Sequence, residues 1–112
     1  KPAIEAADLV IVPVQPTPVD LWATRSTLEM LGAGGGNGVI VLNRVPPRGR
    51  LTGEMVEALR DFGGDVAEST LGNRILYAAC LGEGMTVMEK ERNGKAAAEV
   101  DALATEIAQR LT

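Results

Sequence analysis

The feature that most constrains the fold is an unbroken run of branched apolar residues, Leu9 to Val12. Because no polar residue alternates with these side chains, both faces of the segment should be buried, which is typical of a strand inside a parallel sheet covered by helices. Pro13 cannot donate a hydrogen bond to a neighbouring strand, so regular pairing should end near Val12 or Val14. Gln15 to Pro18 then forms the loop at the carboxyl end of the strand, where ligands bind in open α/β sheets.

Two further segments have the pattern of strands, and helical patterns separate them. Val39 to Leu42 is a second continuous apolar run, and Asp65 to Thr70 is a third, weaker one. This alternation predicts an α/β fold: a parallel sheet of about three strands with flanking helices, one of whose edges is left unpaired.

The other elements are predicted from capping residues, glycines and apolar residues at helical spacing. They are a helix tail at Lys1–Ala7, a helix capped by Thr17 with Asp20 as its reciprocal acid and ended by Gly32, a flexible connection at Gly32–Gly38, a helix from Leu51 to Phe62 capped by Thr52 and stopped by Gly63-Gly64, a short helix at Ile75–Leu81, an extended stretch at Met85–Met88 and a last helix at Lys95–Leu111.

Composition excludes several classes of function. The 112 residues carry a net charge of −4, so indiscriminate nucleic-acid binding is not expected from the total. The chain has no histidine and one cysteine, Cys80, which excludes a His/Cys metal site and a Ser-His triad. No apolar run approaches the roughly 20 residues of a membrane span. We expect no catalytic residue and no metal ligand here, and we expect Cys80 to be a small buried apolar residue.

Asn43 directly follows the second apolar run, at the carboxyl end of the predicted strand. An amide side chain there can reach a ligand in the crevice, and its donor and acceptor suit the edge of a purine base. The simpler alternative is that Asn43 only caps the loop. Leu71-Gly72-Asn73-Arg74 follows the third predicted strand and should lie on the same rim, either as part of a site or as a solvated turn.

Basic side chains gather in one loop that contains no acid. No acidic residue lies between Glu29 and Glu54, whereas Arg44, Arg48 and Arg50 fall in that interval. Guanidinium groups in such a loop suit phosphate contacts, which bind DNA without reading its sequence. The alternative is a solvated loop whose charges aid solubility. Because so few arginines would bind DNA weakly, useful affinity would need a dimer that doubles the patch.

Three groups of residues, taken in their order along the chain, form a recognisable set of motifs. They are Asp8-Leu9-Val10-Ile11-Val12-Pro13-Val14-Gln15-Pro16 with Asp20-Leu21-Trp22-Ala23-Thr24-Arg25, then Val41-Leu42-Asn43-Arg44-Val45, and then Gly82-Glu83-Gly84-Met85-Thr86-Val87. Together they resemble the second half of ParA-type chromosome and plasmid partitioning ATPases, in the ParA/MinD group of P-loop proteins. The resemblance covers nearly the whole chain. It implies that residues 1–112 are one partial domain, the carboxy-terminal half of a Rossmann-like three-layer P-loop NTPase, and that the chain is a fragment of a longer protein.

The resemblance also implies that the two halves of the parent domain bind different parts of ATP. In the family, the Walker A loop and the metal-binding aspartate lie upstream of the position of Ala7. ATP and Mg2+ would therefore belong to the parent protein, neither should bind tightly to this chain, and the chain alone should not hydrolyse ATP. The family's asparagine at the position of Asn43 contacts adenine. The family's Ile-Pro-Arg-Asn loop packs around the base, and here Leu71, Gly72 and Asn73 occupy its place in a shifted pattern.

The same resemblance implies partners. Family members bind DNA non-specifically through basic residues in this half, so Arg48, Arg50 and Arg74 are the candidate DNA-binding residues. It further implies an ATP-bound homodimer, a ParB-like protein that stimulates hydrolysis, and a cytoplasmic location. A role at a membrane is disfavoured because the last helix carries Glu99, Asp101 and Glu106 where a membrane-surface helix would carry Lys and Arg.

Two other functions fit parts of this pattern. The chain could be a non-catalytic interaction module that pairs its open sheet edge with another chain. It could also come from another ParA/MinD-group enzyme, such as an amide ligase of the biotin or cobalamin pathway, although the extra substrate-binding elements of those enzymes are not evident here.

Overall fold

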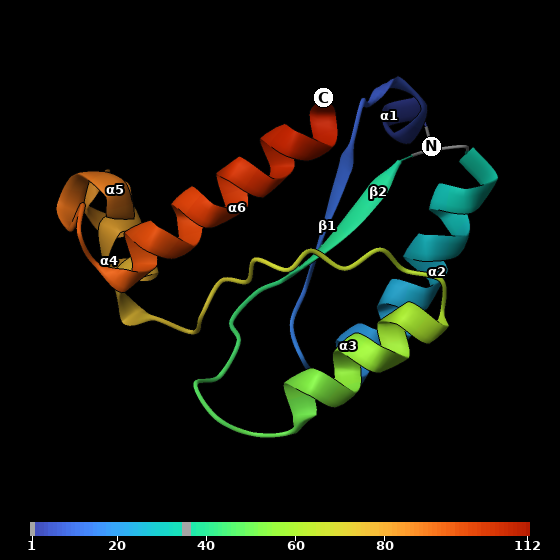
Figure 1. Cartoon of the computed structure of the whole chain (residues 1–112), viewed down its shortest axis with the longest axis horizontal. Helices are drawn as coiled ribbons and strands as arrows, with labels where there is room; N and C mark the ends of the chain where they lie inside the picture. Colours follow the sequence, from blue (N-terminus) through green and yellow to red (C-terminus); the bar gives the residue numbers. More distant parts are fainter. Residues whose placement is uncertain (1, 35–36) are drawn as a thin grey trace.

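Two parallel strands form the centre of the molecule (Figure 1). The computed structural model describes residues 2–34 and 37–112, and its sheet consists of β1 (Val10–Val14) and β2 (Gly38–Leu42). Val10 lies opposite Gly38 and Val14 lies opposite Leu42, so both strands end at the same edge of the sheet. The parallel α/β architecture is therefore as predicted, and both strands lie within one residue of their predicted bounds.

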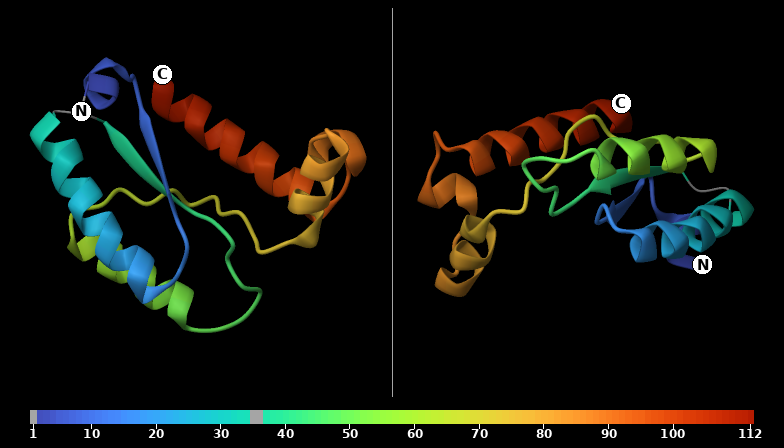
Figure 2. Two further views of the ribbon diagram at one scale, coloured as in Figure 1. Left: turned by 180° about the vertical axis from the view of Figure 1, so that it is seen from behind. Right: turned by 90° about the horizontal axis from the view of Figure 1, so that it is seen from below.

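Helices cover both faces of this sheet (Figures 1 and 2). The described helices are α1 (Pro2–Ala6), α2 (Pro18–Gly34), α3 (Leu51–Asp61), α4 (Ile75–Glu83), α5 (Val87–Lys90) and α6 (Lys95–Leu111). α2 and α3 lie together on one face, and α6 lies on the other. α4 and α5 pack around the start of α6, at the end of the molecule away from α2 (Figure 1).

Alternation along β2 divides the core between the two faces. Ile40 and Leu42 pack with Leu59 of α3 and with residues of β1 and α2. Val39 and Val41 point the other way, toward apolar residues of α6. Because β2 is buried on both faces, it reads as a continuous apolar run in the sequence. A third cluster, around the buried Cys80, joins α4, α5 and α6, which confirms the prediction for this cysteine.

Helix starts were predicted with mixed success. The Thr17 hydroxyl accepts from the Asp20 N–H (3.2 Å) as expected, but the Asp20 carboxylate accepts from the N–H of Gln15 and not from that of Thr17. The predicted Thr52 cap is wrong. Arg50 occupies the N-cap position and already has helical backbone angles, so α3 begins at Leu51, two residues earlier than a Thr52 cap would allow.

Two other boundaries were predicted incorrectly. α2 continues past Gly32 to Gly34, so only the remainder of the predicted Gly32–Gly38 connection is available for a loop, and residues 35–36 of it lie outside the described residues. The Met85–Met88 stretch is not extended, because Thr86 and Glu89 form a reciprocal capping box that starts α5.

The end of α3 explains the glycine pair that follows it. Gly63 has φ +86°, in the left-handed region that favours glycine, and its N–H donates to the carbonyl of Arg60. Gly64 donates to the carbonyl of Leu59, which completes a Schellman motif. A Cβ on Gly64 would lie 2.7 Å from the side chain of Ile40 and 2.9 Å from the Leu59 carbonyl oxygen, so a larger residue would not fit there.

The predicted third strand, Asp65–Thr70, is not a regular strand. The segment runs parallel to β2, but it pairs only through isolated bridges, between Val66 and Ile40 and between Gly72 and Val45. The Glu106 carboxylate of α6 accepts the N–H groups of Glu68 (3.1 Å) and Ser69 (2.8 Å), and the Ser69 N–H is thereby kept from the ladder to which Ala67 and Leu71 donate. Residues 65–73 are called the edge segment below.

At this edge of the sheet, the carboxylates of Glu99 and Glu106 bind backbone N–H groups of the edge segment and so attach it to α6. At the other edge, β1 has no partner strand within residues 2–34 and 37–112, as predicted. Ile11 is 48% exposed and Pro13 is also exposed, whereas Val12 and Val14 are buried, so the prediction that both faces of this strand are buried is wrong. Over the same residues, no helix has both the length and the apolar character needed to cross a membrane.

Candidate functional site

The predicted rim exists, and Asn43 lies on it. Its backbone N–H donates to the carbonyl of Val14 (2.9 Å), which ties the carboxyl ends of β1 and β2 together. The side chain is half-buried, and its Oδ1 accepts from the N–H of Arg44 (2.9 Å). Asn43 therefore does cap the loop, while among the described residues no group accepts from its Nδ2.

The residue after Asn43 has an unusual backbone. Arg44 has φ +54°, and it is the one described residue other than glycine with a positive φ. An arginine in this region is strained, and such strain persists only where the surroundings enforce it, often at functional sites. It turns the chain sharply at the rim, from β2 into the loop that leads to α3.

A cavity of about 220 Å³ lies between this loop and the edge segment. Two hydrogen bonds join the loop to the edge segment. The N–H of Val45 donates to the carbonyl of Leu71, and the N–H of Asn73 donates to the carbonyl of Val45, both at 3.0 Å. The lining residues are Val45, Pro46, Pro47, Thr70, Gly72, Asn73, Arg74 and Glu99. We call this cavity the rim pocket.

The rim pocket brings together only some of the predicted residues. Gly72, Asn73 and Arg74 line it, and the backbone of Leu71 forms the adjoining wall. Asn43 lies on the same rim, but neither it nor the pair Arg48 and Arg50 is among the lining residues.

The three arginines of the loop have no acidic partner among the described residues, in keeping with the absence of acids from this stretch of the sequence. Arg44, Arg48 and Arg50 are exposed, and within the described part of the chain no carboxylate forms an ion pair with any of them. Gly49, between the last two, has φ +122°, which only glycine adopts easily. The loop therefore presents positive charge to solvent.

Arg74 has a different environment. Its Nε and Nη2 donate to the two carboxylate oxygens of Glu99 at 3.0 and 2.9 Å, a bidentate pair. The Tyr77 hydroxyl also donates to Glu99 (2.8 Å), and so does the N–H of Gly72 (3.2 Å). Arg74 therefore has a structural partner that Arg48 and Arg50 lack.

These neighbours favour the charged form of Glu99. The hydrogen bond from Arg74 lowers the pKa of Glu99, against burial, which acts to raise it, and the donors Tyr77 and Gly72 lower it further. Burial, together with the hydrogen bond to Glu99, raises the pKa of Tyr77 to about 12. The carboxylate thus remains ionised and the phenol protonated at neutral pH.

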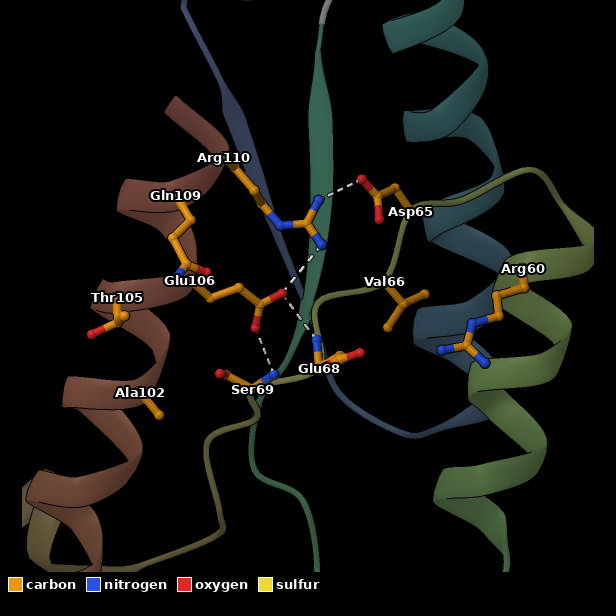
Figure 3. A pocket seen from close by; sticks show the side chains of 10 residues that line it. All are labelled: Arg60, Asp65, Val66, Glu68, Ser69, Ala102, Thr105, Glu106, Gln109 and Arg110. Atoms are coloured by element: carbon orange, nitrogen blue, oxygen red, sulfur yellow. Dashed lines mark hydrogen bonds and ion pairs between the residues drawn. The ribbon is translucent and has the colours of Figure 1, made fainter. Parts of the chain in front are cut away.

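A larger cavity, of about 740 Å³, was not anticipated from the sequence (Figure 3). It is open to solvent between α6, α3 and the first half of the edge segment, and Arg60, Asp65, Glu68, Ser69, Glu106 and Arg110 are among its lining residues. Arg110 bridges Asp65 and Glu106 across it (Figure 3). It lies away from the carboxyl ends of the strands.

The acids of α6 were predicted to form only a charged helix face, whereas two of them bind the edge segment. Glu99 and Glu106 are seven residues apart, close to two helical turns, and so lie on the same side of α6. That spacing was a usable signal, but nothing in the sequence identified their partners in the edge segment, at Arg74 and in α4, which lie 22 to 38 residues away. Among the described residues, no group of three or more His, Cys, Asp or Glu could hold a metal ion.

Comparison with known proteins gives one informative similarity. No protein-family model matches the chain. It is 30% identical over 97 residues to the Maintenance of carboxysome distribution protein A of Halothiobacillus neapolitanus, in an alignment that covers 82% of this chain and 45% of that protein. The chain thus spans about half the length of this curated relative, which is a ParA-family ATPase. The resemblance noted from the sequence motifs is therefore confirmed: the chain is related to the ParA family of ATPases.

Proposed function

We propose that this chain is the carboxy-terminal part of a ParA-type ATPase that distributes DNA or another cargo within the cell. In this proposal it forms one partial domain, the part of a three-layer P-loop NTPase fold that follows the phosphate-binding half. The observation that carries the proposal is the similarity to a ParA-family protein over most of the chain. The supporting geometry is a parallel sheet whose strand ends bear Asn43 and the rim pocket.

The rim suits a nucleobase better than a whole nucleotide. At about 220 Å³, the rim pocket is smaller than the roughly 300–1,000 Å³ of typical ligand sites, so it has room for a flat ring but not for phosphates as well. Asn43 lies on the same rim, where its amide could donate to a base, and Gly72 and Asn73 line the pocket next to Leu71. ATP and Mg2+ would act in the parent protein, where other residues would hold the phosphates and the metal.

Base recognition can be tested by titrating the isotope-labelled chain with adenosine and following backbone amide shifts by NMR. We expect weak binding with shifts at residues 43–45 and 71–73. The Asn43→Ala variant should lose about tenfold in affinity, because one hydrogen bond to the base is removed. Uridine serves as the ligand control, since its edge has a different pattern of donors and acceptors. Equal shifts with adenosine and uridine would contradict adenine recognition.

The exposed arginines support non-specific DNA binding. Phosphate contacts dominate such binding, and Arg48 and Arg50 are exposed and form no ion pair with a carboxylate of the described residues. Arg74 is a weaker candidate because Glu99 already binds it. In this proposal a homodimer of the ATP-bound parent doubles the patch, and a ParB-like protein stimulates hydrolysis and so releases it from DNA in the cytoplasm.

Reversing both charges, Arg48→Glu with Arg50→Glu, should weaken DNA binding about tenfold and flatten its dependence on salt. Fluorescence anisotropy with two unrelated labelled duplexes at low salt measures this, and both duplexes should respond alike. The matched control is Arg92→Glu, another exposed arginine, which lies beyond α5. If Arg92→Glu weakens binding as much as the double variant, total charge and not this loop governs binding.

A second cargo is favoured by one observation. The relative's name assigns it to carboxysome distribution, so a protein particle is an alternative to a chromosome or plasmid as the cargo that the parent of this chain distributes. Co-localisation of a tagged parent protein with nucleoid and particle markers would distinguish the two.

A further inference from the structure

Glu99 makes contacts that connect three parts of the molecule. It belongs to α6, yet its carboxylate binds the N–H of Gly72 in the edge segment, the guanidinium of Arg74 and the hydroxyl of Tyr77 in α4. Its side chain is 21% exposed, and Glu99 itself lines the rim pocket. A carboxylate that accepts several hydrogen bonds from separate elements fixes their relative positions.

The geometry points to Glu99 as the positioning residue of the rim pocket: it holds the Gly72–Arg74 wall in the shape that receives a purine base. This inference rests on the proposed function for the identity of the ligand. Glu99 need not touch the base, since its effect passes through Gly72 and Arg74.

The Gly72–Arg74 wall has few attachments other than those to Glu99. On one side, Leu71 and Asn73 donate to carbonyls of residues 42 and 45, which leaves the N–H of Gly72 facing the opposite side. Glu99 accepts that N–H at 3.2 Å. Without Glu99, the outer side of the wall would have neither this bond nor the bidentate pair to Arg74.

Gly72 itself leaves little room for a side chain beside Glu99. A Cβ at position 72 would lie 3.1 Å from Glu99 Oε2 and 3.3 Å from Arg74 Nε, closer than side chains normally pack. Glycine therefore permits the carboxylate and the guanidinium to approach the backbone of the wall. The residue type at position 72 and the acid at position 99 form one arrangement.

The test uses a matched pair of variants on the same helix, Glu99→Gln and Glu106→Gln. Both acids lie on α6, both accept backbone N–H groups of the edge segment and both pair with an arginine, but only Glu99 lines the rim pocket. Two readouts apply to each 112-residue variant: the hydrogen-exchange rate of the Gly72 amide, and the affinity for adenosine from NMR titration.

We expect Glu99→Gln to raise the exchange rate of the Gly72 amide about tenfold and to weaken adenosine binding about tenfold, because glutamine carries no charge and accepts fewer bonds. Glu106→Gln should leave both quantities within about twofold of the wild type, even where it lowers thermal stability. The Tyr77→Phe variant, which removes one donor, should give a smaller change in the same direction.

The outcomes separate this inference from the proposed function. Equal losses in Glu99→Gln and Glu106→Gln would show general destabilisation and overturn the inference, and so would unchanged exchange at Gly72. If wild-type chain does not bind adenosine, base recognition is overturned, while the exchange rates still decide whether Glu99 holds the wall.

Discussion

Leu59→Ala should lower the free energy of unfolding by about 3 kcal/mol, the largest effect we expect from a single substitution. Leu59 has no exposed surface, and it packs from α3 onto Ile40 and Leu42 of the central strand. Truncation removes buried apolar surface and leaves a cavity between these elements. Since domains of this kind are stable by only about 5–15 kcal/mol, the loss should be evident in urea denaturation followed by circular dichroism.

Leu51→Ala is the matched control on the same helix. Leu51 is 45% exposed at the first residue of α3, so its truncation should cost less than about 1 kcal/mol. Equal costs for the two substitutions would mean that α3 does not pack on β2 as described.

Glu106→Ala should lower the free energy of unfolding by about 2 kcal/mol. It would leave the N–H groups of Glu68 and Ser69 and the guanidinium of Arg110 without the carboxylate they now share. The cavity around Glu106 is open, so water will replace part of this loss. Glu57→Ala, at an exposed position on α3, should change stability by less than about 0.5 kcal/mol.

The contribution of Glu106 should also depend on pH. Burial acts to raise its pKa, but hydrogen bonds from Ser69, Glu68 and Arg110 outweigh burial and lower the pKa to about 2. In the unfolded chain, the same carboxyl takes up a proton near pH 4.5. Its stabilising effect is therefore complete above pH 4.5 and is lost as the pH falls from 4.5 toward 2.

Wild-type and Glu106→Ala proteins should thus converge in stability in acid. At pH 7 we expect a difference of about 1–2 kcal/mol from this ionisation after allowance for screening by solvent, and near pH 2 a much smaller one. Urea midpoints of both proteins across this range provide the measurement. A constant difference from pH 7 to pH 2 would show that the charge on Glu106 does not matter.

The sheet could be predicted because burial on two faces leaves a direct trace in sequence. Val39 to Leu42 has no polar residue, and the structure buries all four side chains. α6 was predicted with its observed bounds, Lys95–Leu111, because its apolar residues recur at helical spacing. The start of α5 carried a readable signal that was overlooked, since Thr86 and Glu89 have the spacing of a capping box.

What the sequence did not predict depends on contacts between distant residues. The Asp65–Thr70 segment has a strand-like composition, but the Glu106 carboxylate takes the N–H of Ser69, which lies between the two N–H groups, of Ala67 and Leu71, that do pair with β2. At the site, Asn43 could be placed from its position after β2, because strand ends meet at one rim. The role of Glu99 could not be predicted, since its partners belong to a loop and a helix more than 20 residues away.

The two carboxylates of α6, Glu99 and Glu106, also constrain the length of the chain between Ser69 and Gly72. From Glu99 to Glu106 the helix rises roughly 10.5 Å, and three extended residues, from Ser69 to Gly72, span roughly 10 Å in the opposite direction. The two elements match only in this register, so inserting or deleting one residue between positions 69 and 72 would let at most one carboxylate dock. Evolutionary change in the length of this connection should therefore require a compensating change in the spacing of acids on the last helix.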